Sequence, residues 1–246
     1  AVIVMAHRYA DLAEELAKAC SDAEQKKMYE TIAENCRMVP ENPPETFLQA
    51  AQLVLFTHDA IMIENMGYIH ALGRFDQYMY EFYKKDLEQG VSEQEIGDII
   101  HEFKLRIEEM WYLRDEFESG AYPGCALYIQ MTLGGQKADG TDACNDLTRL
   151  ILHGMEDLQT KEPPVSFRYH DNVDEETFRL AINVALTGGS HPAFFNDNNS
   201  IPALINIGFT LEQARNWCLL GCTEPIVPGL SDYQSMLGFF NTIKVF

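Results

Sequence analysis

The second half of the chain alternates between strand-like and helix-like segments, and this alternation restricts the folds that the chain can adopt. Short runs containing β-branched and aromatic residues predict strands at 127–132, 165–170 and 193–196. Runs between glycine and proline breaks predict helices at 143–158, 174–188, 201–208 and 211–216. The order strand, helix, strand, helix indicates an α/β fold, built either as a barrel or as a layered sheet.

The first half of the chain is predicted to be helical. Apolar residues recur at helical spacing, with charged faces between them, over 7–20, 23–35, 44–59, 75–87 and 92–118. Ser92 and Glu95 have the spacing of a capping box at the start of the last of these helices. The prolines at positions 40, 43 and 44 give the only hint of a boundary in the chain.

The composition favours an enzyme of the cytoplasm. Among 246 residues, 38 are acidic and 18 basic, and the net charge of −20 disfavours binding to nucleic acid or to an anionic membrane. No run approaches the roughly 18 consecutive apolar residues of a membrane helix. The six cysteines form no CxxC pair, so neither a zinc site nor a disulfide framework is indicated, and reduced thiols are expected.

The stretch Gly221-Cys222-Thr223-Glu224-Pro225 places a thiol two residues from a carboxylate, between an apolar run at 214–220 and a turn-rich loop at 226–232. In an extended conformation residues i and i+2 point the same way, so Cys222 and Glu224 would face one small molecule together. The alternative is a buried structural cysteine beside a surface glutamate in a turn, because free cysteines commonly act as small hydrophobic residues.

Five stretches, taken in order, resemble the glycyl radical enzyme family, which includes pyruvate formate-lyase and the glycerol, choline and hydroxyproline enzymes. Gly221–Pro225 is similar to the family's cysteine loop in its Gly-Cys-x-Glu-Pro form. The others are Cys36–Pro40 with Pro43–Ala50, Leu72–Met79 (similar to the GRxDQ helix region), Thr132–Gly135 with Asp139–Gly140, and Pro192–Asp197. The resemblance implies the helix-rich part of the family's α/β barrel, with a helical lead-in at 1–40 and the barrel core, including the cysteine loop 221–225, at 41–246.

The resemblance also implies a radical reaction. Cys222 occupies the position at which a stored glycyl radical generates a thiyl radical, which removes hydrogen from a carbon beside a hydroxyl group. Glu224 would then take the proton of that hydroxyl, and its burial is expected to raise its pKa toward the working range. The family's formate-lyases cleave C–C bonds and lack a glutamate here, so Glu224 favours elimination of water, an amine or sulfite. Cys218, which lies outside the motif, is interpreted as structural.

The resemblance also implies substrate-binding residues. For each of them an ordinary structural role is the alternative. Tyr128 corresponds to a bulky aromatic against the substrate, Ser235 and Phe239 to contacts after the cysteine loop, and His70 to a residue of the GRxDQ region that either faces the cavity or is a helix histidine with a satisfied hydrogen bond. Arg74 and Asp76 are expected to form an architectural salt bridge. Asn196 and Asp197 are expected to shape the loop opposite Cys222.

The family's C-terminal Arg-Val-x-Gly-aromatic motif, which carries the radical, does not occur in the sequence. The chain is therefore expected to be an internal fragment, inactive by itself, whose complete form has its glycyl radical installed by a radical-SAM activating enzyme and is a homodimer. No other directly bound cofactor is expected. The alternatives are a truncated scaffold or pseudoenzyme, a formate-lyase-type C–C lyase, and a thiolate enzyme in which His191 would lower the pKa of Cys222.

Overall fold

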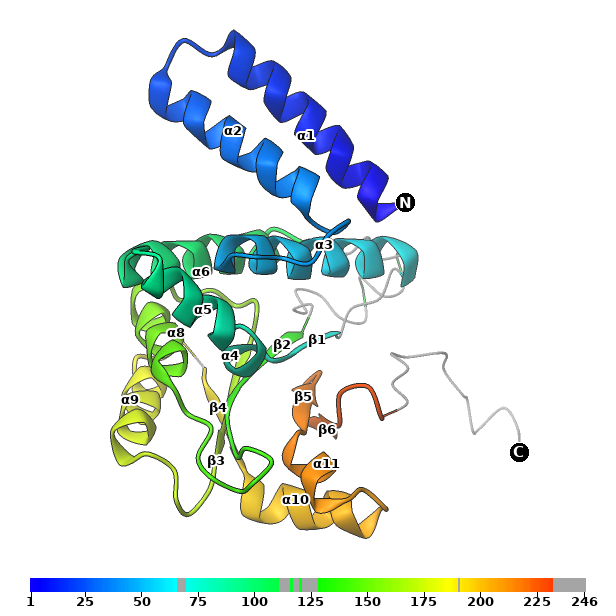
Figure 1. Ribbon diagram of the computed structural model, residues 1–246. Coiled ribbons are helices and arrows are strands. Elements are labelled where there is room, and N and C mark those ends of the chain that lie inside the picture. The colour runs from blue at the N-terminus through cyan, green and yellow to red at the C-terminus, as the bar shows by residue number, and fades with distance from the viewer. Residues whose placement is uncertain (66–69, 111–115, 117–119, 121–127, 190, 232–246) are drawn as a thin grey trace, which may run out of the picture.

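The computed structural model describes residues 1–65, 70–110, 116, 120, 128–189 and 191–231. Within these ranges the α/β fold is confirmed: a parallel sheet has the strand order β1-β2-β3-β4 and is covered by helices (Figure 1). Each strand pairs with the next one in the chain, so the sheet has the sequential topology of an α/β barrel wall. The strands are β1 His70–Arg74, β2 Ile129–Gly134, β3 Val165–Tyr169 and β4 Ala193–Asn196.

The helix that directly precedes β1 and the helices that follow the first three strands cover one face of this sheet. The described helices of the core are α3 Phe47–Asn65, α4 Phe75–Tyr78, α5 Tyr80–Glu88, α6 Glu93–Glu108, α8 Asp146–Asp157, α9 Glu175–Leu186, α10 Asp197–Asn206 and α11 Leu211–Arg215. Phe103 of α6 and Ile151 of α8 join one buried cluster with Ile129, Met131 and Phe167 of the sheet. Burying one such side chain contributes roughly 1.5–3 kcal/mol, so this face holds the main core.

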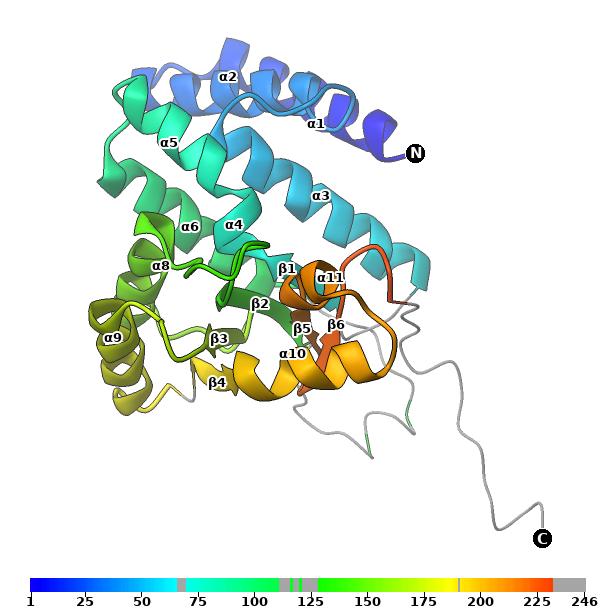
Figure 2. The same ribbon diagram turned by 60° about the horizontal axis from the view of Figure 1, so that its bottom comes forward.

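A small hairpin covers the other face. Its strands, β5 Cys218–Leu220 and β6 Glu224–Ile226, pair antiparallel, and β5 lies against β1 and β2. Figure 2 shows the hairpin beside these strands, with α10 and α11 next to it. Because helices cover one face and the hairpin covers the other, β2 is buried along its whole length. Neither strand of the hairpin is predicted by the sequence pattern.

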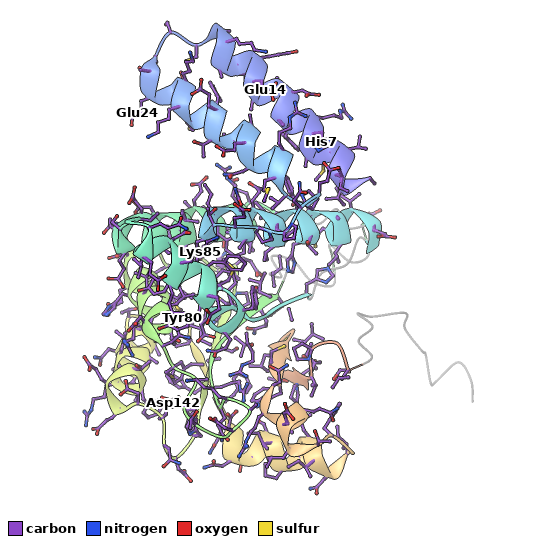
Figure 3. All side chains as sticks on the ribbon, viewed as in Figure 1. His7, Glu14, Glu24, Tyr80, Lys85 and Asp142 are labelled. Carbon is purple, nitrogen blue, oxygen red and sulfur yellow. The ribbon has the colours of Figure 1, made fainter. Side chains whose placement is uncertain are left out.

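The first two helices form a separate layer. α1 Val2–Ala19 and α2 Ala23–Met38 are antiparallel and lie across α3, on the side away from the sheet (Figure 1). Ala6, Ala10 and Ala13 are buried along α1, and such small side chains allow a close approach of the two helices. Glu24 lies exposed near the start of α2, whereas Glu14 of α1 accepts hydrogen bonds from Arg37 of α2 over 3.2 and 3.0 Å and so links the two helices (Figure 3).

Local signals at helix ends are well reproduced. The predicted capping box is confirmed: Glu95 N donates to Ser92 Oγ over 3.2 Å, and Ser92 N donates to the Glu95 carboxylate over 2.8 Å. The helix predicted at 75–87 is divided at Met79 into α4 and α5.

No helix in the described ranges combines the length and apolar character needed to cross a membrane.

Two expectations around the GRxDQ region are wrong. His70 lies in strand β1 rather than in a helix, whereas the helix predicted from Phe75 does begin there. Arg74 and Asp76, both within the described ranges, form no salt bridge, because strand changes to helix between them and each side chain finds other partners. Arg74 donates to the carbonyls of Gly134 and Gln136 over 3.1 and 2.9 Å.

Asp76 joins three elements of the core. Its carboxylate accepts hydrogen bonds from Gly134 N over 2.8 Å and from Thr148 Oγ1 over 2.6 Å, and its carbonyl oxygen accepts one from Asn145 Nδ2 over 2.9 Å. The side chain is fully buried, and this burial raises the pKa of Asp76. Asp76 therefore fixes the end of β1 against the end of β2 and the start of α8.

Candidate active site

Cys222 lies at the tip of the β5–β6 hairpin. Leu220 pairs with Glu224 across the hairpin, so Gly221, Cys222 and Thr223 form the connecting turn. Gly221 has a φ of 55°, a left-handed conformation that glycine adopts without steric cost. The side chain of Cys222 is exposed, whereas Cys218 at the base of the hairpin is 1% exposed, and burial raises the pKa of Cys218 to about 11. Only the tip cysteine of this hairpin is placed to meet a small molecule.

Two details of the predicted loop are wrong in this structure. Cys222 lies in the turn and Glu224 in the strand, so the two residues do not share the extended geometry that the sequence suggests. Glu224 is exposed rather than buried, because in the described residues its strand is paired only with β5. Its carboxylate accepts a hydrogen bond from Thr223 N over 3.2 Å. The thiol and the carboxylate nevertheless lie at the same end of the hairpin.

The hairpin runs from the carboxyl ends of the sheet strands toward their amino ends. Arg168, near the end of β3, donates to Trp217 O over 2.6 Å, and Leu219 N donates to Thr132 Oγ1 in β2 over 3.0 Å. Arg168 pairs with Gly134 of β2, so Trp217 lies near the level of Gly134. Leu219, two residues later, lies at the level of Thr132, two residues earlier on β2. Continuing in this direction, the turn containing Cys222 is directed toward the amino ends of β1 and β2 (Figure 1).

Tyr128 and His70 lie at those amino ends. His70 pairs with Ile129, so Tyr128 is one residue from the partner of His70 on the neighbouring strand. Tyr128 has a φ of 56°, which costs a non-glycine residue about 1–3 kcal/mol and is typical of functional sites. The Glu162 carboxylate accepts hydrogen bonds from Tyr128 N over 2.7 Å and Ile129 N over 3.1 Å, which holds this backbone. Two of the predicted substrate-binding residues are thus brought together.

The remaining predicted positions are located differently. Ser235 and Phe239 lie outside the described residues. Asn196 caps α10 by accepting a hydrogen bond from Asn198 N over 2.9 Å. His191 lines a narrow space with Lys104 and Met155 beside α6 and α8, and no contact between His191 and Cys222 occurs in the described structure, so the geometry does not support a thiolate–imidazole pair.

Three residues near the base of the hairpin belong to a buried charged cluster. Arg168 is fully buried and forms a bidentate pair with Asp197, with both N–O distances 2.8 Å. Trp217 Nε1 donates to Asp197 over 2.8 Å. Sequence reasoning placed Asp197 in a loop opposite Cys222 and overlooked the other two. The sequence did contain one signal for this cluster: Arg168 lies in a strand whose other residues are mostly apolar. A buried charge requires a partner, so such an arginine indicates a buried ion pair.

His58 of α3 packs against His70. Their ring centroids are 5.9 Å apart with an edge-to-face orientation, and His58 is 6% exposed. Burial, followed by the neighbouring His70, lowers the pKa of His58 to about 4. His58 is therefore neutral at ordinary pH and supports His70 by packing.

Acid should destabilise the chain through His58. The unfolded chain takes up a proton near pH 6.5 and the folded chain only near pH 4, so stability is full above pH 6.5 and falls as the pH drops through this window. The loss amounts to about 3 kcal/mol at about 1.4 kcal/mol per pH unit. Urea unfolding at pH 7 and pH 4.5 should show a smaller loss in His58→Leu than in the parent. The exposed His153→Leu control should lose as much as the parent; equal losses in all three would contradict the assignment.

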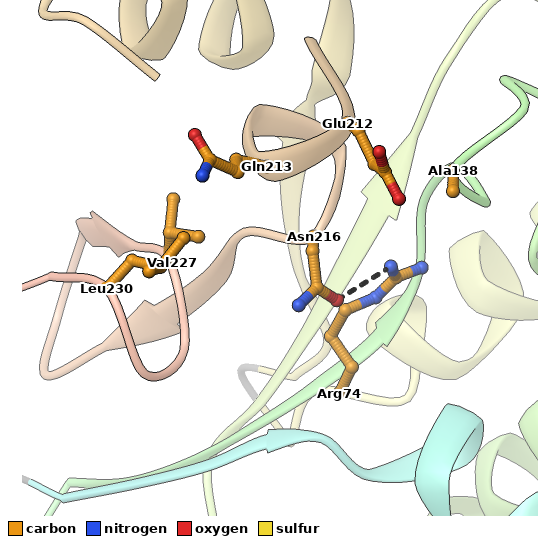
Figure 4. A pocket seen from close by; sticks show the side chains of 7 residues that line it. All are labelled: Arg74, Ala138, Glu212, Gln213, Asn216, Val227 and Leu230. Atoms are coloured by element: carbon orange, nitrogen blue, oxygen red, sulfur yellow. Dashed lines mark hydrogen bonds between the residues drawn. The ribbon is translucent and has the colours of Figure 1, made fainter. Parts of the chain in front are cut away.

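A cavity lies beside the base of the hairpin. Its volume is about 270 Å³, and Figure 4 shows Arg74 and Asn216 approaching each other within it over 3.5 Å. The lining residues are Arg74, Ala138, Glu212, Gln213, Asn216, Val227 and Leu230. Within the part of the chain that the structure describes, this lining includes none of Cys222, Glu224, Tyr128 and His70, so it differs from the surface at the hairpin tip.

Known proteins share this arrangement. A model of the family described as pyruvate formate lyase-like matches residues 1–246. A probable dehydratase of Escherichia coli, YbiW, is 33% identical over 244 residues, which are 97% of this chain and 30% of that protein. Structures described for 1,2-propanediol dehydration in Roseburia inulinivorans and for a glycyl radical enzyme from Archaeoglobus fulgidus are 36% and 33% identical, with TM-scores of 0.89 and 0.88. They match 93% of this chain, which spans 29% and 30% of their lengths.

Proposed function

The chain belongs to the pyruvate formate lyase-like family of glycyl radical enzymes, and on this premise we propose that it is the part of a radical lyase that carries the reactive cysteine and its partner glutamate. The observation that supports the proposal best is the position of Cys222, exposed at the tip of a hairpin whose base is buried against the parallel sheet. The reaction proposed is elimination from a small hydroxylated substrate.

The proposed reaction begins and ends at the sulfur of Cys222. When installed by a radical-SAM activating enzyme, a stored glycyl radical would supply the oxidising power, as the acceptor of the hydrogen atom that the Cys222 thiol gives up. Cys222 Sγ then removes hydrogen from the substrate carbon beside a hydroxyl group, which is feasible because S–H and such C–H bonds have similar strengths. After elimination, Cys222 returns a hydrogen atom to the product radical, so its thiyl radical is regenerated.

Glu224 is proposed to be the general base. A hydroxyl group on a carbon radical is much more acidic than an ordinary alcohol, so a carboxylate within hydrogen-bond distance can take its proton. The electron density that remains expels a leaving group from the adjacent carbon. In a dehydration the departing hydroxyl takes up the proton held by Glu224 and leaves as water; in related eliminations the leaving group is an amine or sulfite. Water must be kept away from these radicals, so the proposal requires further segments of the complete protein to cover the exposed hairpin tip.

His70 and Tyr128 are proposed to contact the substrate, because the hairpin tip is directed toward the strand ends that carry them. Ser235 and Phe239 are proposed as further contacts. The chemical class proposed for the substrate is a small diol or related hydroxylated compound, in agreement with the presence of a glutamate two residues after the cysteine. We further propose that the complete enzyme is a cytoplasmic homodimer.

The proposal is tested by assaying the complete, anaerobically activated protein against small diols and hydroxylated sulfonates. Glu224→Gln preserves shape but removes the base, and should lower kcat by about 10²–10⁴-fold while the glycyl radical signal persists. Glu212→Gln, at an exposed glutamate on α11, is the matched control and should retain the parent rate. Parent activity in Glu224→Gln would contradict a base at this position; C–C cleavage products would favour a formate-lyase-type reaction. No turnover despite a stored radical would favour a scaffold.

A further inference from the structure

The tip of the hairpin makes few contacts of its own, so its position depends on how its base is held. Residues 222–225 are exposed, whereas Cys218, Leu219 and Leu220 are buried. Within the described structure β5 pairs in a sheet only with β6; it packs against β1 and β2, and Leu219 N donates to Thr132 Oγ1 of the parallel sheet. The residues immediately before β5 add polar anchoring to this packing.

Arg168 provides that anchoring from the parallel sheet. Its NH1 donates to Trp217 O over 2.6 Å and its NH2 donates to Arg215 O over 3.0 Å, so one guanidinium holds two carbonyls just before β5. The guanidinium carbon also lies 4.5 Å from the ring centroid of Trp217. Arg74 of β1 reaches the carbonyl of Arg215 as well, over a longer 3.4 Å, and is the weaker second anchor.

The guanidinium of Arg168 is itself fixed in orientation. Asp197 accepts two parallel hydrogen bonds from this guanidinium and a third from Trp217 Nε1. Each of the three side chains therefore contacts the other two. All three are at most 1% exposed. A Cβ added at Gly135 would lie 2.5 Å from Cζ of Arg168, which shows how closely the backbone of the sheet encloses the guanidinium.

We propose that Arg168, Asp197 and Trp217 form a positioning cluster that sets where the β5–β6 hairpin leaves the sheet, and so sets the distance from Cys222 Sγ to the substrate carbon. The proposal rests on the function proposed above for Cys222. Trp217 is five residues from Cys222, so a shift at the base is transmitted directly to the tip. Hydrogen transfer requires reacting atoms about 3–3.5 Å apart, and a misplacement of about 1 Å can cost 10²-fold in rate.

Trp217→Phe tests the cluster with a small change. It keeps an aromatic ring over Arg168 but removes the N–H that binds Asp197. In the complete, activated protein, kcat should fall about 10–100-fold, while KM stays within about threefold and the glycyl radical signal is unchanged. Hydrogen exchange of the backbone amides at 217–226 should become at least about tenfold faster, because local opening governs exchange. Arg168→Lys, which keeps the charge but cannot form the bidentate pair, should behave in the same way.

Tyr83→Phe is the matched control, since Tyr83 is 2% exposed and donates one side-chain hydrogen bond to Glu93 over 2.8 Å in α5 and α6. It should leave both kcat and hairpin exchange unchanged. Unaltered exchange at 217–226 in Trp217→Phe, or equal losses of kcat in both aromatic variants, would overturn the positioning role. Failure of the proposed function is distinguishable, because it would appear as parent turnover in Cys222→Ala whatever the exchange of the hairpin amides.

Discussion

Replacing Cys222 by alanine should abolish turnover in the complete, activated protein while leaving its stored glycyl radical intact. In the proposed mechanism the thiol accepts and returns hydrogen because its S–H bond is similar in strength to the substrate C–H bond, and alanine has no such hydrogen to exchange. Cys218 cannot substitute, since it is 1% exposed at the base of the hairpin. Product formation and the glycyl radical signal are measured on the same sample. Together they distinguish loss of hydrogen transfer by Cys222 from failure to install the glycyl radical.

Cys20→Ala is the control for this experiment, because Cys20 is a partly exposed free cysteine just after α1 and belongs to no proposed site. It should retain the parent rate. Measurable turnover in Cys222→Ala would exclude the thiyl mechanism. Alkylation of Cys222 by iodoacetamide across pH provides an independent check, since a thiolate nucleophile would react well below the usual range of thiol pKa values.

The largest loss of stability is expected from Arg168→Leu. Removing one partner of a buried ion pair leaves the other charge uncompensated, and here the Asp197 carboxylate remains fully buried. The free energy of unfolding should fall by about 3–5 kcal/mol. Urea denaturation of the full chain, monitored by tryptophan fluorescence and by circular dichroism, measures this loss.

A double variant distinguishes the origin of that loss. In Arg168→Leu/Asp197→Leu no buried charge is left unpaired, so part of the stability should return relative to Arg168→Leu alone. The recovery should be incomplete, since the Trp217 carbonyl and its indole N–H lose their partners and the Arg215 carbonyl keeps only the longer bond from Arg74. If the stability lost in Arg168→Leu/Asp197→Leu equals the sum of the losses in the two single variants, the two side chains do not act as a pair.

The parts of the fold that the sequence predicts are those with strong local signals. β3 and β4 are found at nearly the predicted positions, and Ser92 starts α6 as its capping box requires. β1 was missed because its sequence, His-Ala-Leu-Gly-Arg, contains no β-branched residue and includes a glycine. α10 begins at Asp197 rather than at 201, because Asn196 caps a polar first turn that resembles a loop in the sequence.

The candidate site was only partly predictable. Cys222 and Glu224 follow from a local motif, but their arrangement depends on a turn that closes a hairpin of two three-residue strands, too short to show an alternating pattern. His70 and Tyr128 come together through the pairing of strands far apart in the chain, which a single sequence does not reveal. The Arg168–Asp197–Trp217 cluster likewise joins three separate elements, and only the buried arginine signals it.

The division of the hairpin into an anchored base and an open tip has an evolutionary consequence. Thr223 and Pro225 are exposed in the described structure, so under the proposed function substitutions there would alter what the substrate meets without disturbing the packed base of the hairpin. Such surface changes usually shift stability by no more than about 0.5 kcal/mol. A lineage can therefore acquire preferences for new substrates through changes at the tip, while selection for a stable scaffold acts on a different set of residues.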